Sequence, residues 1–205
     1  MTRLDIISSY IKDGEKVLDV GCDKAHLSRI LARRGIYSIA SDIHKHIIDE
    51  AINLTNEELK KYITFKVGDG ITIEDESEYT LVLAGMGTYT ILDIISNSKK
   101  EFKKIITISN NNHNILRKEM TKYGYKVDLE EIIKEKNKYY NLIVFVKGFK
   151  EYSKEELIIG VNHKNKLLLK EKNDILISKY KEILCKKDIK DIKDTLNILL
   201  NYNNY

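Results

Sequence analysis

Two aspartates, each in a short β-branched apolar run, have the spacing of a nucleoside-binding site. Asp19 lies in the run that leads into Gly21, and Asp42 ends the next such run, 23 positions after Asp19. A glycine between a buried strand and a helix lets a ligand approach the backbone closely, and the helix start offers free N–H groups to a carboxylate or phosphate. An acidic residue at the end of the second strand is placed to bind ribose hydroxyls. The sequence therefore contains both ends of a cradle for an adenosine.

The glycine loop departs from the dinucleotide-binding pattern. Cys22 and Asp23 stand where that pattern has further glycines, so a bound pyrophosphate and a nucleotide-dependent dehydrogenase are the least favoured interpretations. The segment could also be a plain strand-to-helix turn with Asp23 as the helix N-cap. The presence of Asp42 favours the ligand site.

Two more loops follow apolar runs. Asp69 lies between two glycines, of which Gly70 is the second, and the segment 84–87 reads Ala-Gly-Met-Gly. Open α/β sheets bind ligands at the carboxyl ends of their strands, where small residues leave room. Each loop could instead be a tight turn. If all four loops meet at one edge of a sheet, they enclose a site large enough for a nucleoside.

Strand-like and helical patterns alternate over the first 150 residues, which predicts a parallel sheet with helices on both faces. Two longer strand-like runs at 125–133 and 139–149 predict a hairpin, so we expect the sheet to close with an antiparallel strand. Gly35 and Gly124 are C-cap candidates for two of the helices. The five short runs are 17–20, 37–40, 63–67, 81–84 and 105–108.

From about residue 151 the pattern is helical, and we treat 1–150 and 151–205 as two domains. Apolar residues of the second domain have helical spacing at Ile175, Leu176, Tyr180, Ile183 and Leu184, and again at Ile189, Ile192, Leu196 and Leu199. The second group steps by 3, 4 and 3 positions, as in a coiled-coil seam. We therefore expect two helices packed on each other. With eleven lysines and nine acidic residues, this region is not a strongly basic arm.

The composition is that of a globular protein with a modest positive charge. The 205 residues are 42% hydrophobic and 32% charged, with a net charge of +4 that permits an anionic partner without demanding one. Two distant cysteines form no disulfide framework. The first residues lack the apolar core of a signal peptide, and no run is long enough to span a membrane. We expect a cytoplasmic monomer that contacts no membrane.

Three other candidates carry less weight. His44 and His46 point in different directions on a helix and have no third ligand near in sequence, so we expect no metal site. His113 could line a base pocket, but an exposed loop histidine is the favoured interpretation. For Cys22, packing is favoured over nucleophilic chemistry.

The segment 19–27, Asp-Val-Gly-Cys-Asp-Lys-Ala-His-Leu, resembles the Asp-Ile-Gly-Ser-Asp-His-Ala-Tyr-Leu segment of the bacterial tRNA adenine-N1 methyltransferases that act on position 22. Further matches occur in the same order and cover about residues 1–150. The sequence departs from the family at Lys24 and His26, and its Gln-Pro-Asn becomes the segment 108–110, in which Asn110 is kept. The other matches are Arg3-Leu4, Ser41-Asp42, Gly68-Asp69-Gly70, Ala84-Gly85-Met86-Gly87, Leu116-Arg117 and Gly124-Tyr125.

The resemblance implies a class I, Rossmann-like methyltransferase sheet with a small C-terminal helical domain. It also implies transfer of a methyl group from S-adenosylmethionine (SAM) to adenine N1 in tRNA, with S-adenosylhomocysteine as product. Asp23 and Asn110 are the candidate catalytic residues. The implied cofactor-binding residues are Asp19, Gly21, Asp23, Ala25, His26, Asp42, Ile43, Asp69, Gly70, Ala84, Gly85 and Met86.

Two other hypotheses stay open at this point. The chain could methylate a small molecule or a protein. It could also be a non-catalytic RNA-binding relative, which the changes at Lys24, His26 and the segment 108–109 motivate. Transfer of the methyl group of labelled SAM to tRNA distinguishes the tRNA methyltransferase from both of them.

Overall fold

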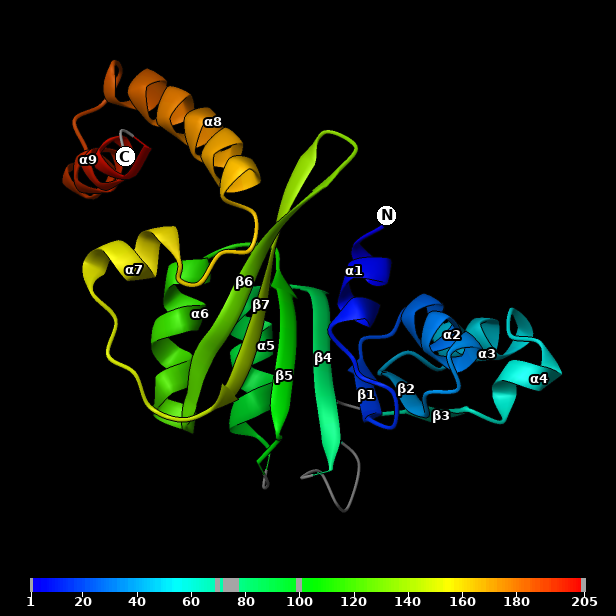
Figure 1. Ribbon diagram of the computed structural model, residues 1–205. Helices are drawn as coiled ribbons and strands as arrows, with labels where there is room; N and C mark the ends of the chain where they lie inside the picture. Colours follow the sequence, from blue (N-terminus) through cyan, green and yellow to red (C-terminus); the bar gives the residue numbers. More distant parts are fainter. Residues whose placement is uncertain (1, 69–70, 72–77, 99–100, 204–205) are drawn as a thin grey trace.

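A seven-stranded β-sheet forms the centre of the molecule (Figure 1). The structure, a computed structural model, describes residues 2–68, 71, 78–98 and 101–203. The strand order is β3-β2-β1-β4-β5-β7-β6, with the first five strands parallel and β7 antiparallel to both of its neighbours. The strands are β1 (Lys16–Val20), β2 (Ser38–Asp42), β3 (Ile63–Val67), β4 (Tyr79–Met86), β5 (Lys104–Ser109), β6 (Tyr125–Glu135) and β7 (Lys138–Lys147). The predicted mostly parallel sheet with an antiparallel closing strand is confirmed.

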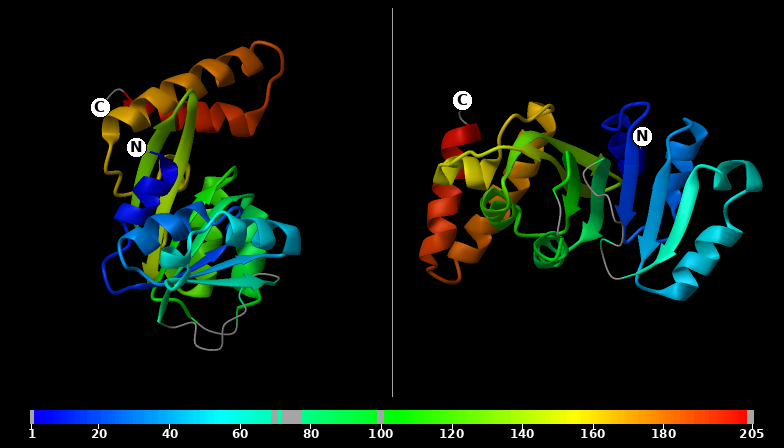
Figure 2. Two further views of the ribbon diagram at one scale, coloured as in Figure 1. Left: turned by 90° about the vertical axis from the view of Figure 1, so that its right-hand side faces the viewer. Right: turned by 90° about the horizontal axis from the view of Figure 1, so that it is seen from below.

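Helices cover both faces of this sheet, as predicted (Figure 2). One face packs Ile7 of α1 and Leu31 of α2 against the strands, and the other packs Ile91 of α5 and Leu116 of α6. These helices are α1 (Arg3–Ser9), α2 (His26–Arg33), α3 (Lys45–Asn53), α4 (Glu57–Lys60), α5 (Thr88–Ser96) and α6 (His113–Met120). A 3₁₀ turn, η1 (Thr121–Tyr123), follows α6.

The strand order reverses at β1, which pairs with β2 on one side and β4 on the other. At such a switch point the connecting chains leave the sheet in opposite directions, so a crevice opens beyond the carboxyl ends of the two strands. Both Asp19 on β1 and Ala84 on β4 lie at this edge. The fold therefore places the predicted loops after β1 and β4 around one crevice.

The two strands of the β6–β7 hairpin are longer than β5, the strand with which the hairpin pairs. Asn141 pairs with Ser109, the last residue of β5, so residues 138–140 project beyond that strand. The tip of the hairpin and α1 both lie at the edge where the parallel strands end (Figure 1). This edge is therefore walled by α1 and by aromatic residues of the hairpin.

Three helices follow the sheet: α7 (Lys154–Ile159), α8 (Lys166–Leu184) and α9 (Lys190–Asn203). Leu169 and Ile177 of α8 pack with Leu199 of α9 and with Ile132 of the hairpin. The expected pair of packed helices is confirmed. Ile175 and Ile189, however, are exposed, because Ile175 lies on the outer side of α8 and Ile189 precedes α9. No helix among the described residues is long and apolar enough to cross a bilayer.

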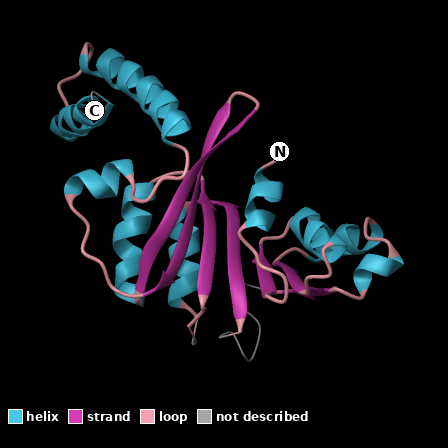
Figure 3. Ribbon diagram, in the orientation of Figure 1, coloured by secondary structure: helices cyan, strands magenta, loops and turns pink. Residues whose placement is uncertain are grey.

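A buried ion pair joins α6, β6 and the segment that leads to the C-terminal helices, whose backbone is shown in Figure 3. Arg117 of α6 and Glu130 of β6 are almost completely buried, and two parallel hydrogen bonds of 2.8 and 2.6 Å join their side chains. Arg117 also donates to the carbonyl of Leu157 in α7, and Glu130 accepts from the backbone N–H of Val161. A Cβ atom on Gly160 would lie less than 3.0 Å from both charged groups. The pair therefore connects the sheet, α6 and the segment that leads to the C-terminal helices.

We expect Glu130→Gln to lower the free energy of unfolding by about 3–5 kcal/mol, because it leaves the Arg117 charge buried without a counter-ion. Urea unfolding followed by circular dichroism measures this loss. The matched control is Asp49→Ala, which removes an exposed i,i+4 pair with Lys45 and should change stability by about 0.5 kcal/mol or less. Equal effects of the two substitutions would contradict the structural role of the buried pair.

Candidate active site

A cavity of about 410 Å³ lies at the crevice between β1 and β4. Six residues from the predicted site line it: Asp19, Gly21, Asp23, His26, Ala84 and Gly85. The wall opposite the β1 loop is formed by α1, through Arg3, Leu4 and Ile7. The sequence thus identified the loops of this cavity, whereas the contribution of α1 could have been inferred only from the Arg3-Leu4 match.

Gly21 has both a backbone and a steric requirement for glycine. Its φ of +70° belongs to the left-handed region, which favours residues without a Cβ atom. A Cβ atom there would lie 2.2 Å from the terminal methyl carbon of Met86. The backbone N–H groups of Gly21 and Cys22 both donate to the carbonyl of Ser41, at 2.8 and 3.0 Å. The β1 loop is therefore fastened to the end of β2 and lies directly against the β4 loop.

The turn into α2 is unusual, because Asp23 and Ala25 both have a left-handed backbone with φ near +50°. Ala25, and not Asp23, is the N-cap residue, and it makes no side-chain capping bond. The interpretation of Asp23 as the N-cap is therefore wrong, because the left-handed turn places it two positions too early. The Asp23 carboxylate lines the cavity instead, and the first N–H groups of α2 have no side-chain cap.

The two residues that depart from the family pattern have clear contacts. Lys24 forms an ion pair with Glu50 of α3 at 2.6 Å. The ring Nδ1 of His26 lies 2.9 Å from the guanidinium of Arg29, which also donates to the Lys24 carbonyl. Because an arginine can only donate, Nδ1 of His26 is the acceptor and Nε2 carries the ring proton. His26 is therefore oriented as a hydrogen-bond donor beside the cavity.

Asp19 lies in a desolvated position at the base of the cavity, with 5% of its surface exposed. Burial raises the pKa of its carboxyl group to about 7, and the negative charge of Asp42 contributes in the same direction. A cationic ligand in the cavity would stabilise the ionised form. Asp19 is thus suited to a positively charged group and not to a phosphate.

Asp42 ends β2 and, unlike Asp19, is not among the residues that line this cavity; 13% of its side chain is exposed. Its Oδ1 atom accepts from the backbone N–H of His44 at 3.0 Å, which fixes the carboxylate. Ile43, which follows, and Val67, which pairs with Asp42 in the sheet, are apolar side chains exposed by 60% and 51%. This pair offers an apolar surface next to a carboxylate, a combination that suits a nucleoside. Sequence reasoning missed Val67, whose exposure depends on the strand register.

The predicted residues Asp69 and Gly70 lie outside the described residues. The described part of their loop begins at Gly68, whose N–H donates to the Asp42 carbonyl at 3.0 Å.

A second hollow, of about 570 Å³, adjoins the first and shares Arg3 and Gly85 with it. Asn110 lines it, and its side-chain amide donates to the Gly85 carbonyl at 2.8 Å. Tyr139 and Tyr140 of the hairpin tip form another wall, and the Arg3 guanidinium stacks over the Tyr140 ring at 4.1 Å. The two candidate catalytic residues therefore face adjoining hollows, Asp23 in the first and Asn110 in the second. The tyrosines were missed, because the hairpin register decides where they lie.

His113 is not the exposed loop residue that the sequence favoured. It is the first residue of α6 and lies half-buried with Nε2 3.0 Å from the Ser109 carbonyl. Burial, together with the nearby charge of Lys172, lowers the pKa of His113 to about 4. The ring is therefore neutral at physiological pH. It faces the second hollow because the turn after β5 folds back toward the site.

Cys22 is buried, and burial together with the charges of Asp19 and Asp42 raises the pKa of its thiol. The packing interpretation of Cys22 is thus confirmed, since a nucleophilic cysteine needs a lowered pKa. The expectation that His44 and His46 point in different directions on a helix is wrong: His44 is the N-cap of α3, with an extended backbone, and the two rings contact each other edge to face. The described part of the chain contains no cluster of three side chains that could hold a metal ion.

The relatives of the chain are methyltransferases. Its sequence is 25% identical over 190 residues to the tRNA (adenine(22)-N(1))-methyltransferase of Bacillus subtilis (strain 168), which covers 89% of this chain and 80% of that protein. The structure of M. capricolum TrmK in complex with S-adenosyl-homocysteine has a TM-score of 0.85 at 22% identity, covering 100% of this chain and 97% of that one. A Streptococcus pneumoniae protein in complex with S-adenosyl-L-methionine has a TM-score of 0.88 at 23% identity, covering 98% of both chains.

The methyltransferase domain family matches residues 1–143. This match runs from α1 into β7 and includes every residue that lines the cavity between β1 and β4. By this match over more than half of its length, the chain belongs to the methyltransferase domain family.

Proposed function

We propose that this protein transfers the methyl group of SAM to N1 of an adenine in tRNA, at position 22 in the D-arm. The observation that carries the proposal is the pair of adjoining hollows that share Arg3 and Gly85, one lined by the loops after β1 and β4 and one lined by an amide and two tyrosines. The relative from Bacillus subtilis, which is named for this reaction and matches 89% of the chain, supports the choice of substrate.

The first cavity and the end of β2, where the charge of Asp42 acts on Asp19, together fit SAM. Asp42 would bind the ribose hydroxyls, Ile43 would offer an apolar surface to the adenine, and the Gly21 turn would let the ligand approach the chain closely. Asp19 suits the positive charge of the ligand, and the uncapped start of α2 suits its carboxylate. When bound, SAM supplies a methyl group that is already activated by its sulfonium. Ala25, His26, Ala84, Gly85 and Met86 complete the proposed cofactor site, together with Asp69 and Gly70.

The second hollow would hold the target adenine. Adenine N1 has its own lone pair, so the chain needs to align the base and exclude water, and alignment can supply roughly 7–11 kcal/mol of the barrier. The amide nitrogen of Asn110 is held by the Gly85 carbonyl, which leaves its Oδ1 as an acceptor for the exocyclic amino group of the base. The base gains positive charge as N1 is methylated, and both Oδ1 of Asn110 and the carboxylate of Asp23 would stabilise that charge.

N1 lies on the Watson–Crick edge, so the adenine must be unpaired or flipped out of its helix, at a cost of a few kcal/mol. Tyr139 and Tyr140 offer ring faces for stacking with the extruded base. Arg3 already covers one face of Tyr140 and bonds Glu135 at 2.8 Å, so that ring is held in place.

We also propose that the protein is a cytoplasmic monomer whose two domains bind different parts of the substrates. Residues 1–150 would bind SAM and the target base, and residues 151–205 would grip the body of the tRNA through its shape and phosphates. The projecting hairpin, which contacts α8 through Tyr139 and Glu171, supports this arrangement because it brings the C-terminal helices next to the base pocket.

Methyl transfer from labelled SAM to unmodified tRNA transcripts, followed by mapping of the labelled nucleotide, tests the function. We expect the label on N1 of adenine 22, and none on a transcript that carries guanine at this position. Binding of SAM without transfer to any tRNA would refute the proposal and favour a protein substrate, a small-molecule substrate or a non-catalytic relative.

We expect Gly21→Ala to weaken SAM binding at least about 10-fold, because the new methyl group displaces the side chain of Met86 at the cavity and strains the backbone. Isothermal titration calorimetry measures the affinity. Gly35→Ala is the matched control: Gly35 has a similar φ of +73°, but a Cβ atom there meets nothing within 4 Å. Gly35 lies beyond the other end of α2 and does not line the cavity, so an equal loss of affinity in both variants would show that the effect of Gly21→Ala is not specific to the cavity.

The affinity for SAM should rise with pH up to about 7 and then level off. The ionised form of Asp19 favours a cationic ligand, and with its pKa raised to about 7 the ionised fraction grows through this range. Asp19→Asn cannot ionise, so its affinity should be lower above pH 7 and nearly independent of pH. Parallel pH profiles for the two proteins would show that Asp19 does not interact with the ligand.

A further inference from the structure

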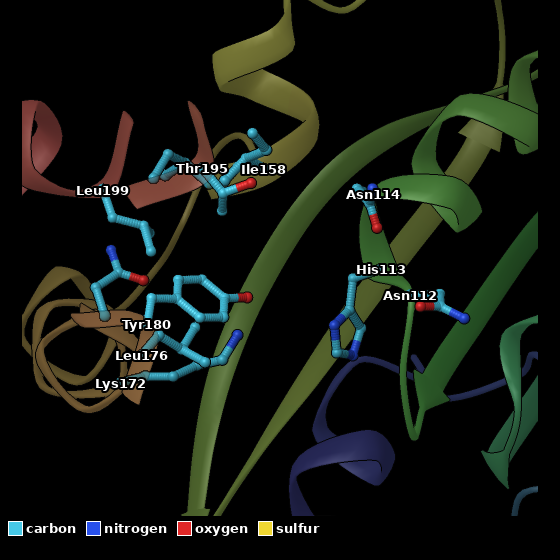
Figure 4. Close-up of a pocket in the computed structure, with 11 residues that line it drawn as sticks. Asn112, His113, Asn114, Ile158, Lys172, Leu176, Tyr180, Thr195 and Leu199 are labelled. Atoms are coloured by element: carbon cyan, nitrogen blue, oxygen red, sulfur yellow. The ribbon is translucent and has the colours of Figure 1, made fainter. Parts of the chain in front are cut away.

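A third hollow, of about 310 Å³, lies between the sheet and the C-terminal helices (Figure 4). Asn112, His113 and Asn114 at the start of α6 form one side, and Lys172 and Tyr180 of α8 reach toward them from the other. His113 also lines the hollow that contains Asn110, so the two hollows meet at its ring. The third hollow is therefore one residue away from the proposed base pocket.

The charges around this hollow do not balance. The ammonium of Lys172 donates to Oδ1 of Asn141 at 2.6 Å, which is a neutral partner. Among the described residues, no carboxylate forms an ion pair with it. The nearest buried carboxylate, Glu130, is already engaged by two hydrogen bonds from Arg117 and one from Val161. Two cations thus share one anion, and His113 is neutral.

Burial lowers the pKa of Lys172 to about 8, with a further contribution from the charge of Arg117, so the side chain is still protonated at neutral pH. Lys172 is partly buried. A partly desolvated cation without an ion-pair partner is unfavourable, and an anion that enters the hollow would relieve this cost. The start of α6 acts in the same direction, because its N-cap residue Asn112 makes no side-chain capping bond and its dipole favours negative charge. The hollow therefore suits an anion that arrives with the substrate.

We propose that this hollow binds a backbone phosphate of tRNA that flanks the target adenosine, with Lys172 as its main ligand. The inference rests on the proposed function and adds a subsite to it. An adenosine whose base enters the pocket at Asn110 has a phosphate on either side, and the ring of His113 separates that pocket from Lys172. Lys172 also donates to Asn141, which pairs with Ser109 at the end of β5. A phosphate bound to Lys172 would therefore be linked through Asn141 to the strand that positions Asn110.

The test uses tRNA transcripts in which one phosphate, either 5′ or 3′ of adenine 22, is replaced by an uncharged methylphosphonate. With the wild-type protein, we expect one of the two substitutions to lower kcat/KM for tRNA about 10-fold, as for the loss of one charge-assisted hydrogen bond, mainly through KM. The other substitution should have little effect. This measurement needs no change in the protein.

Lys172→Met should lower kcat/KM for unmodified tRNA by a similar factor, leave SAM affinity unchanged and be insensitive to the methylphosphonate. Lys172→Arg should retain most of the wild-type activity and its sensitivity. Lys170→Met, an exposed lysine of the same helix that does not line the hollow, is the matched control and should behave as the wild type. Thermal unfolding of each variant shows whether it is folded.

The inference is overturned if neither methylphosphonate lowers kcat/KM of the wild-type protein. It is also overturned if the modified transcript lowers kcat/KM of the wild type and of Lys172→Met by the same factor. Either result would leave the proposed function intact, because the wild-type protein still methylates unmodified tRNA. Absence of transfer to unmodified tRNA is a different outcome, which removes the proposed function and the phosphate site together.

Discussion

The bidentate pair of Arg117 and Glu130 is the interaction on which the arrangement of the site depends. Its two charges are removed from water, and such a pair is tolerable only when further hydrogen bonds occupy the remaining donors and acceptors. Here those partners are backbone groups of Leu157 and Val161, which belong to the segment after the sheet. The chain cannot satisfy the pair without folding that segment back onto α6 and β6. The C-terminal helices are therefore placed by a polar constraint as well as by apolar packing.

This placement has a consequence at the carboxyl edge of the sheet. The C-terminal helices come to rest against the β6–β7 hairpin, and α8 inserts Lys172 next to Asn141. Three hollows then follow one another along the edge, joined first by Arg3 and Gly85 and then by His113. Cofactor, base and phosphate would occupy them in that order. The parallel sheet with α1 and α2 provides the first of these, and the hairpin and the helices that follow it contribute to the other two.

The three hollows differ in the charged side chains that line them. The first cavity holds Asp19, whose pKa is raised by burial and whose ionised form a cationic ligand would stabilise. The third holds Lys172, a partly buried lysine that forms no ion pair with any of the described residues. The second hollow lies between them and combines neutral groups, namely the Asn110 amide, the His113 ring and two tyrosines, with the cations Arg3 and Lys138. The carboxylate thus lies at the end proposed for the methyl donor, and the cations lie in the two hollows proposed for the RNA strand.

The sequence by itself determined the parallel sheet, the hairpin and the loops of the cofactor cavity. These depend on local signals: β-branched runs, Gly21 in a turn that requires a left-handed residue, and an acid at the end of the second strand. Tertiary structure decided the rest. The exposure of Val67 and the position of Tyr140 follow from strand register, and His113 enters the site because the chain turns back after β5. The surroundings of Lys172 come from segments distant in sequence, so its desolvation leaves no local pattern that a sequence could reveal.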